Sequence, residues 1–315
     1  PLRLCRFVWH CLTFRPQIIH LQGAQHPALY ILLWAMLRLL GSASFVYTPQ
    51  DVLPNSLRPY HIRAFRVLYA RMRHVFLNAK QNEPLVVEHF AVPRDRITVL
   101  PIADLTAFVR EHVAGEPPDI PAASRVVLCF GLIEPRKGIH TLLSAAPEVL
   151  RQVPDALLLI VGKPLMDIAP LQRQLTDLGL QERVRLVPQY VSFAQMAGYF
   201  TAARLLVLPY ENGWNSGVLA SAFGFGKPVI ATRVGGFDEV VSDESTGLLV
   251  PPKDPAVLAQ AIVRLLRDDV LYARMVTNVR QAAAEISWEA IARITAARYA
   301  DVVGIGADCA VSQAR

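Results

Sequence analysis

The sequence predicts an α/β protein in which parallel sheets are covered by helices on both faces. Short apolar runs alternate with helical stretches along most of the chain, the order typical of parallel sheets. Hydrophobic residues make up 53% of the chain and charged residues 18%, which suits strands buried on both faces. A length of 315 residues is sufficient for two domains, each with its own core.

The first half of the chain contains four expected strands separated by helical stretches. The strands are expected at residues 17–22, 44–48, 74–78 and 96–101, and the helices at about 26–40, 59–73 and 80–91. Residue 1 is Pro, and no earlier strand with a glycine-rich loop is found, so we expect residues 1–112 to be an incomplete domain. Its first strand would then be an apolar edge, which predicts poor solubility.

The second half reads as one complete doubly wound domain over residues 120–287. Its strands are expected at 125–130, 156–162, 184–188, 205–209, 228–233 and 248–251. Asp254 and Pro255 form an N-cap and first helical residue, and open a helix to about residue 267. Ser287 is the expected cap of a last helix, over about 288–302. Glycine and prolines within 106–124 predict a hinge between the two domains.

The net charge of +6 is unevenly distributed. Residues 1–115 hold 13 Lys and Arg against 6 Asp and Glu, whereas the remainder holds 19 against 20. This excess predicts an anionic partner near the first domain, such as an acidic membrane surface or a lipid-phosphate acceptor. Basic and aromatic residues are not interleaved, so nucleic acid is not an expected partner.

The cysteines and apolar runs bear on the cellular compartment. The four cysteines are scattered without a Cys-x-x-Cys pair, which indicates neither a zinc site nor a disulfide framework. The longest apolar run, 28–37, is too short to span a membrane and favours a buried helix over an interfacial one. No signal peptide is apparent, so we expect a cytoplasmic protein, either free or peripheral at the membrane.

Residues 203–252 carry the strongest functional signal. A strand candidate at 205–209 leads into a loop in which Ser216 and Gly217 open a helix of small residues, and Gly226-Lys227-Pro228 ends that helix. A second strand and a glycine pair follow at once. Two helix N-termini therefore lie at one edge of a parallel sheet, where free N–H groups and helix dipoles favour an anion. This pattern predicts a phosphate-binding site.

The order and spacing of these pieces resemble the donor-binding domain of the family-four retaining glycosyltransferases, which have the two-domain GT-B fold. The resemblance covers about 17–303 and is strongest over 125–252. The matching residues are Gly131, Lys137-Gly138, Val161-Gly162, Leu208-Pro209, Ser216-Gly217-Val218, Gly226-Lys227-Pro228-Val229-Ile230-Ala231, Gly235-Gly236, Glu239 and Thr246-Gly247-Leu248-Leu249-Val250. The resemblance implies two Rossmann-like domains, with the helix at 288–303 packing back on the first.

The loop after the first strand of the second domain is expected to bind the donor diphosphate. Gly131 begins this loop, and Lys137 matches the diphosphate lysine of the family, for which a catalytic role follows because a fixed cation stabilises the leaving phosphate. The family usually has an arginine where this chain has Leu132, and Arg136 is the candidate substitute. The alternative is that Arg136 and Lys137 only solvate a helix start.

The loop at 211–221 departs from the family pattern. The family has two glutamates eight positions apart, and the corresponding positions here are Gly213 and Ser221. The loop resembles an Asn/Gln-Ser-Gly-Val variant, so the donor-binding candidates are Asn215, Ser216, Gly217, Val218 and Ser221. Ser221 would bond a ribose hydroxyl more weakly than a carboxylate. Glu211 becomes a catalytic candidate only if the loop is reshaped, and is otherwise a solvated loop residue.

The remaining candidates surround these two loops or come from the first domain. Gly162 and Tyr190 are expected near the nucleotide, and His20 near the donor sugar as a catalytic candidate. Gln50, Asp51 and Trp214 are the acceptor-side candidates. Because Gln50 stands where the family often has histidine, and an amide takes no proton, acid–base catalysis there is not expected.

The expected function is transfer of a sugar from a nucleotide-diphosphate sugar to a glycan, lipid-linked or small-molecule acceptor. The resemblance implies retention of configuration, and neither a metal nor a cofactor; no Asp-x-Asp motif is found. The main alternative is a non-catalytic GT-B-like protein that binds a nucleotide, a glycan or a partner, because both glutamates are missing. A dinucleotide oxidoreductase would need a Gly-x-Gly-x-x-Gly motif, which is absent, and a sugar-nucleotide epimerase has no specific support.

Overall fold

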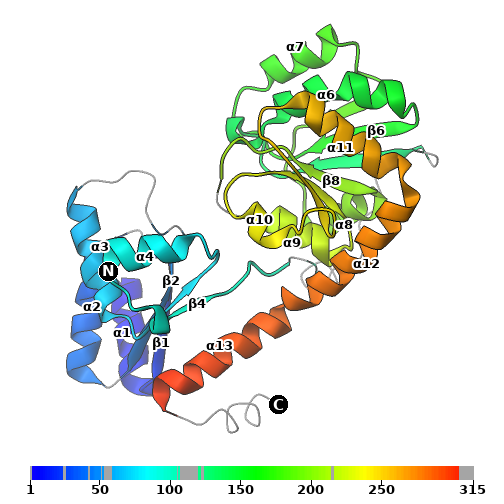
Figure 1. The fold of residues 1–315 in the computed structure, drawn as a ribbon. Coiled ribbons are helices and arrows are strands. Elements are labelled where there is room, and N and C mark those ends of the chain that lie inside the picture. The colour runs from blue at the N-terminus through cyan, green and yellow to red at the C-terminus, as the bar shows by residue number, and fades with distance from the viewer. Residues whose placement is uncertain are drawn as a thin grey trace. The chain divides into compact units, whose positions relative to one another are not determined.

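The computed structural model describes residues 2–23, 26–41, 43–50, 52, 59–104, 106, 120–121, 124–213 and 216–304. The chain divides into two compact units (Figure 1). The first comprises residues 1–101 and 291–315, and the second residues 102–290. Both are built on parallel sheets, which confirms the predicted fold class.

The first unit contains a four-stranded parallel sheet of order β1-β2-β3-β4. The strands are β1 Ile18–Gln22, β2 Ser44–Thr48, β3 His74–Leu77 and β4 Ile97–Val99, so each expected strand is present. The helices between them are α2 Pro27–Leu40, α3 Pro59–Arg71 and α4 Asn82–Phe90, with the 3-10 turn η1 Arg94–Arg96 before β4. An additional helix, α1 Leu2–Phe14, precedes β1 and was not predicted.

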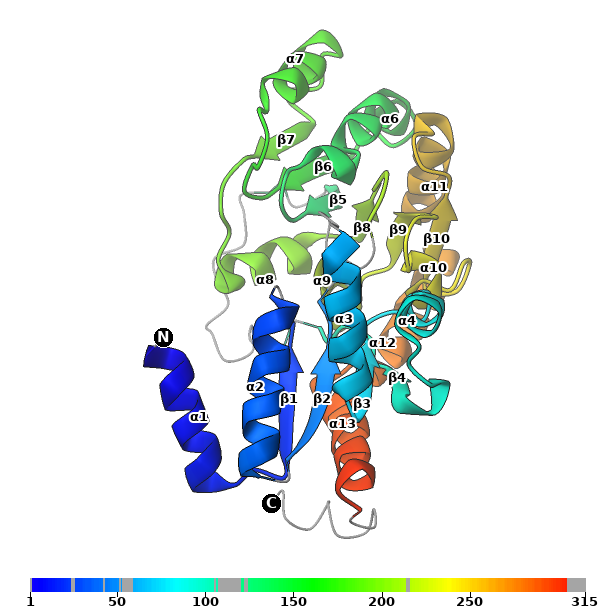
Figure 2. The ribbon, with the colours of Figure 1, turned by 90° about the vertical axis from the view of Figure 1, so that its left-hand side faces the viewer.

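Alternate side chains of the first sheet enter two different cores. Phe45 and Tyr47 of β2 join the core formed with α2, α3 and α4. Figure 2 shows α2 and α3 lying along this sheet. Val46, between them, packs with residues of the last helix, α13 Trp288–Val303, on the opposite face. The sheet is therefore covered on both faces, as its apolar composition requires.

The second unit contains a six-stranded parallel sheet of order β10-β9-β8-β5-β6-β7. The strands are β5 Arg125–Phe130, β6 Ala156–Val161, β7 Val184–Val187, β8 Leu205–Leu208, β9 Val229–Thr232 and β10 Gly247–Val250. Between and after them lie η2 Pro135–Lys137, α6 Ile139–Gln152, α7 Ala169–Asp177, α8 Phe193–Ala202, α9 Gly217–Gly224, α10 Phe237–Val240, α11 Pro255–Arg267 and α12 Asp269–Glu285.

Both faces of the second sheet are also buried. Val127 and Cys129 of β5 point to the core formed with α6 and α11, whereas Val126 and Leu128 point to the core formed with α8 and α9. The alternation explains why this strand is an unbroken apolar run in the sequence. The strands and helices of the second unit thus form a doubly wound domain.

Side chains at the helix ends explain several sequence motifs. The Asp254 carboxylate accepts hydrogen bonds from the backbone N–H of Ala256 (3.1 Å) and Val257 (3.0 Å), which confirms the predicted cap. The Lys227 ammonium donates to the carbonyls of Thr201 (3.0 Å) and Ala203 (2.7 Å) at the end of α8. The lysine of Gly-Lys-Pro therefore stabilises a helix C-terminus.

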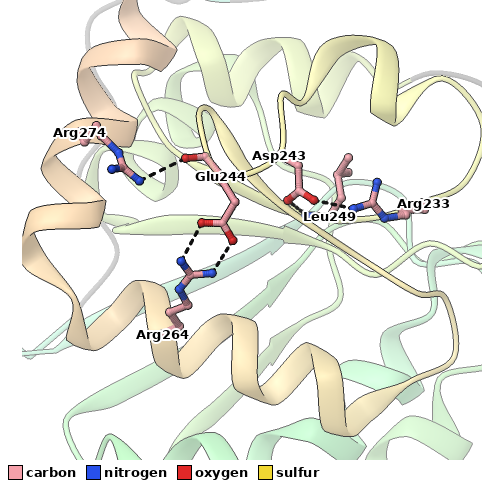
Figure 3. A network of polar contacts seen from close by, with 6 residues as sticks. All are labelled: Arg233, Asp243, Glu244, Leu249, Arg264 and Arg274. Atoms are coloured by element: carbon pink, nitrogen blue, oxygen red, sulfur yellow. Dashed lines mark hydrogen bonds and ion pairs between the residues drawn. The ribbon is translucent and has the colours of Figure 1, made fainter.

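The connection between β9 and β10 is held by ion pairs (Figure 3). Asp243 pairs with Arg233 (2.5 Å) and also accepts the Leu249 backbone N–H (2.9 Å). The Glu244 carboxylate forms a bidentate ion pair with Arg264 of α11 (2.5 and 2.7 Å). The Glu244 backbone carbonyl accepts a hydrogen bond from the Arg274 guanidinium of α12 (3.5 Å). The network ties this sheet edge to both helices.

The two ends of the second unit lie together. The Trp288 indole N–H donates to the carbonyl of Asp104 (2.8 Å), and the Asp104 carboxylate accepts the Thr106 backbone N–H (2.8 Å). The Ser287 hydroxyl accepts the Ala290 N–H (3.1 Å), the cap expected for the last helix. Over the described residues, no helix combines the length and apolarity that a membrane span requires.

Candidate functional site

The order of the second sheet creates a switch point between β5 and β8. From β5 the chain proceeds through β6 to β7 on one side, whereas β8, β9 and β10 follow on the other side. The connections after β5 and β8 therefore leave the sheet in different directions and open a crevice at the carboxyl ends of these strands. Most of the second-unit candidates follow these strands or β6.

Close backbone contact joins the loops after β5 and β6. A Cβ on Gly162 would lie 1.7 Å from the Gly131 carbonyl oxygen, so only glycine fits there. The Gly131 N–H donates to the Val161 carbonyl (3.0 Å), and the Gly162 N–H to the Val187 carbonyl (3.0 Å). Tyr190 follows β7 and is 72% exposed, which leaves its ring available to a ligand.

Lys137 is brought into the crevice by an equally close approach. It ends η2, and Gly138 follows with φ +63°. A Cβ on Gly138 would lie 1.9 Å from the Pro209 carbonyl oxygen, so the start of α6 packs directly on the end of β8. The Lys137 side chain is thereby buried, with the residue only 8% exposed.

Lys137, Tyr210 and Ser216 form a hydrogen-bonded cluster. The Lys137 ammonium donates to the Tyr210 hydroxyl and lies 3.8 Å from the centre of the tyrosine ring. The Tyr210 hydroxyl is 3.1 Å from the Ser216 hydroxyl. Because Ser216 immediately precedes α9, the cluster joins the lysine to a helix N-terminus.

The electrostatic state of Lys137 is unusual for a lysine. Burial, and then the neighbouring Arg136 charge, lower the pKa of Lys137 to about 8. No carboxylate forms an ion pair with it within the described part of the chain. The buried thiol of Cys129 beneath it has its pKa raised to about 12 by burial and supplies no negative charge at neutral pH. A bound anion would therefore supply the negative partner that the described residues do not give the Lys137 ammonium.

The start of α9 faces the loop after β5. The Val218 methyl group lies 3.3 Å from the position that a Cβ on Gly131 would take, which places the two motifs side by side. The position that a Cβ on Gly217 would take has no neighbouring atom within 4 Å. Ser221 is fully buried and its hydroxyl donates to the Gly217 carbonyl (2.7 Å), so no surface of Ser221 is presented to a ribose.

Arg136 and Glu211 have protein partners. The Arg136 guanidinium pairs with the Glu134 carboxylate (2.6 Å). The Arg136 backbone carbonyl accepts a hydrogen bond from the Glu211 backbone N–H (2.8 Å). The Glu211 carboxylate lies 2.9 Å from the His140 ring nitrogen and 3.1 Å from the Lys253 ammonium. Arg136, His140 and Glu211 also line a cavity of about 490 Å³. Sequence reasoning did not anticipate His140 or Lys253.

The candidates of the first unit form a local network. One ring nitrogen of His20 contacts the Tyr299 hydroxyl and the other lies 2.7 Å from the Thr48 hydroxyl. Burial lowers the pKa of His20. Gln50 lies after β2, and its side chain packs under Gly23, 3.3 Å from the position of a Cβ there. Asp51, Trp214 and Asn215 lie outside the described residues.

Tyr210 is the main residue that the sequence reasoning missed. It is 1% exposed and touches both phosphate-site candidates, Lys137 and Ser216. Its position two residues after β8, at the carboxyl end of a switch-point strand, is the signal that could have identified it.

Comparison with known proteins places the chain in a family. The family model described as glycosyl transferases group 1 matches residues 124–268. A phosphatidyl-myo-inositol mannosyltransferase of Mycobacterium leprae is 38% identical over 174 residues, which cover 55% of this chain and 45% of the relative. A D-inositol 3-phosphate glycosyltransferase of Corynebacterium efficiens is 30% identical over 236 residues, which cover 71% of this chain and 55% of the relative. The chain thus spans about half the length of these relatives.

Solved structures share the fold. Anabaena HepE in complex with UDP gives a TM-score of 0.77 at 20% identity, over 95% of this chain and 82% of HepE. A sucrose-phosphate synthase of Thermosynechococcus elongatus gives a TM-score of 0.71 at 24% identity, over 96% of this chain and 77% of the synthase chain. These structures show the GT-B fold, and the family model together with the sequence relatives shows that the chain belongs to the glycosyl transferases group 1, which are family-four glycosyltransferases.

Proposed function

We propose that the protein transfers a sugar from a nucleotide-diphosphate sugar to an acceptor hydroxyl, with retention of configuration and without a catalytic metal. The observation that carries this proposal is the Lys137 ammonium, buried at the switch point without a carboxylate partner among the described residues. Retention and metal independence rest on the family resemblance alone.

The proposed chemistry uses the cluster around Lys137. When the bond between the sugar and the diphosphate breaks, its electron pair passes to a phosphate oxygen, and negative charge develops there. The acceptor oxygen forms the new bond to the anomeric carbon, and the proton of the acceptor hydroxyl passes to the leaving diphosphate. The fixed cation of Lys137 and the N–H groups at the start of α9 stabilise this charge without reorganising. Tyr210 orients Lys137 and Ser216, and Tyr190 stacks on the base. Arg136 adds to the positive potential, although its guanidinium also pairs with the Glu134 carboxylate.

Three candidates are left out of this proposed chemistry. Both ring nitrogens of His20 have hydroxyl partners, the Glu211 carboxylate lies against the His140 ring and the Lys253 ammonium, and Ser221 is buried. We propose structural roles for them. The acceptor-side roles of Gln50, Asp51 and Trp214 remain proposals.

The acceptor is proposed to be anionic, for example a phosphorylated or lipid-linked polyol. Residues 1–115 carry an excess of basic residues, 13 against 6 acidic, which would attract such a molecule. The names of two relatives refer to inositol phosphate and phosphatidyl-myo-inositol. The cytoplasmic location, with or without membrane contact, is likewise a proposal.

A non-catalytic nucleotide-binding protein is the second candidate function. It is favoured by one observation: Gly213, buried Ser221 and paired Glu211 present no free carboxylate to a donor sugar. The test incubates the full chain with UDP-, GDP- or ADP-sugars and myo-inositol 3-phosphate, and analyses products by mass spectrometry. A glycosylated product absent with Lys137→Met supports transfer. Nucleotide binding without any product, including free sugar, supports the second candidate.

A further inference from the structure

A pocket of about 420 Å³ in the first unit gathers four arginines away from the carboxyl ends of its strands. Arg38 lies in the last turn of α2, Arg71 ends α3, Arg73 directly precedes β3, and Arg96 directly precedes β4. Trp34, Ser44, Phe45 and Met72 complete most of the lining. In parallel βαβ units, helices end where the next strands begin, so the topology brings these residues to the amino-terminal edge of the sheet. Figure 2 shows α2 and α3 along this sheet.

The four guanidinium groups have no anionic partner within the described residues. None of them takes part in any of the ion pairs or side-chain hydrogen bonds found there. Arg71 lies over the Trp34 ring, 4.8 Å from its centre, which orients one guanidinium without neutralising it. Asp95 adjoins Arg96 in sequence but is not paired with it. Like charges are thus concentrated in one concave site.

Helix dipoles explain only half of this arrangement. Arg38 and Arg71 lie at helix C-termini, where partial negative charge favours cations. Arg73 lies outside any helix, and Arg96 ends the three-residue 3-10 turn η1, which is too short to have a comparable dipole. The volume falls within the range of small-ligand sites, and planar guanidinium groups bind phosphate oxygens in pairs.

We propose that this pocket binds a phosphate monoester dianion, at a site separate from the carboxyl edges of the two sheets. The ligand is either a free phosphate compound or the phosphate headgroup of a lipid, which share this chemistry. Trp34 lies in the pocket wall and reports occupancy by its fluorescence. The proposal does not depend on the proposed transferase activity, because it uses none of the same residues.

The test uses the full chain in the Lys137→Met background, so that phosphate cannot bind the donor site. Inorganic phosphate, and separately phosphatidylcholine vesicles with and without phosphatidic acid, are titrated while tryptophan fluorescence is followed. Trp34→Phe should remove the change, since Trp34 is the tryptophan in the pocket. Saturable binding should weaken at least about tenfold in Arg73→Gln/Arg96→Gln. The matched control is Arg6→Gln/Arg63→Gln, which removes two exposed arginines of the same unit outside the pocket and should change affinity about twofold or less.

Each outcome is decisive. Binding of inorganic phosphate with this variant pattern supports a free phosphate ligand; binding only to phosphatidic acid vesicles, with the same pattern, supports a lipid headgroup. No saturable binding of either probe, or equal weakening in both double variants, overturns the proposal. If the Arg73→Gln/Arg96→Gln variant does not fold, Arg38→Gln, at an exposed helix end, takes its place and should also weaken binding.

Discussion

Replacing Lys137 by Met is expected to stabilise the unliganded protein while removing its affinity for a nucleotide diphosphate. Burial lowers the pKa of Lys137 from 10.5 to about 8. At 1.36 kcal/mol for each unit, the charged form costs the folded state about 3 kcal/mol. The variant loses a hydrogen bond to Tyr210, worth about 1 kcal/mol, so a net gain of about 2 kcal/mol in unfolding free energy is expected at pH 7.

The pH dependence of the unfolding free energy tests whether the lowered pKa of Lys137 causes this difference in stability. Because the folded pKa is lowered, the unfolded state of the wild type binds more protons between pH 8 and 10.5, and wild-type stability rises through this window. The advantage of Lys137→Met is therefore complete below pH 8 and disappears by about pH 10.5.

The assay is urea unfolding of the full chain, followed by circular dichroism at pH 7 and pH 10. Lys163→Met is the matched control: Lys163 is exposed close to the same loops, and its replacement should leave stability unchanged. A Lys137→Met protein less stable than the wild type at pH 7, or a difference that is unchanged at pH 10, would refute the argument.

Three further substitutions test the geometry of the site. Gly138→Ala should destabilise the second unit by about 2 kcal/mol or more and impair donor binding, because a Cβ would meet the Pro209 carbonyl at 1.9 Å; an unchanged urea midpoint would contradict this. Tyr210→Phe keeps the ring under Lys137 but removes the shared hydroxyl, and should weaken nucleotide affinity about five- to tenfold by calorimetry; equal affinity would exclude the orienting role. Tyr190→Ala should weaken nucleotide binding about tenfold with an unchanged melting temperature, since Tyr190 is 72% exposed; a lowered melting temperature would instead indicate a packing role.

The fold could largely be predicted because buried parallel strands are visible as apolar runs. In the described part of the chain, each of the ten strands corresponds to an expected segment, with ends that differ by at most two residues. Helix α11 was located by its Asp254 and Pro255 cap signals, which act locally. Helix α1 was missed because no acidic first turn or capping residue announces its start.

The candidate site was predicted only as far as local sequence allows. Lys137 and Ser216 were identified because each lies at a helix start after a strand. Their connection through Tyr210 depends on the approach of Gly138 to Pro209, which joins segments far apart in the sequence. The pairing of Glu211 with His140 and Lys253 is equally long-range, so no single-sequence pattern could have shown that this carboxylate is occupied.

The central claim is that the switch-point edge binds a nucleotide diphosphate through Lys137. Its most direct test is the melting temperature of the full chain with UDP, GDP and ADP, for the wild type, Lys137→Met and Lys163→Met. A ligand at a hundred times its Kd stabilises the folded state by about 2.7 kcal/mol, which is readily measured. We predict stabilisation by a nucleotide diphosphate in the wild type and Lys163→Met, and none in Lys137→Met. No stabilisation of the wild type by any of the three, or stabilisation that persists in Lys137→Met, would contradict the claim.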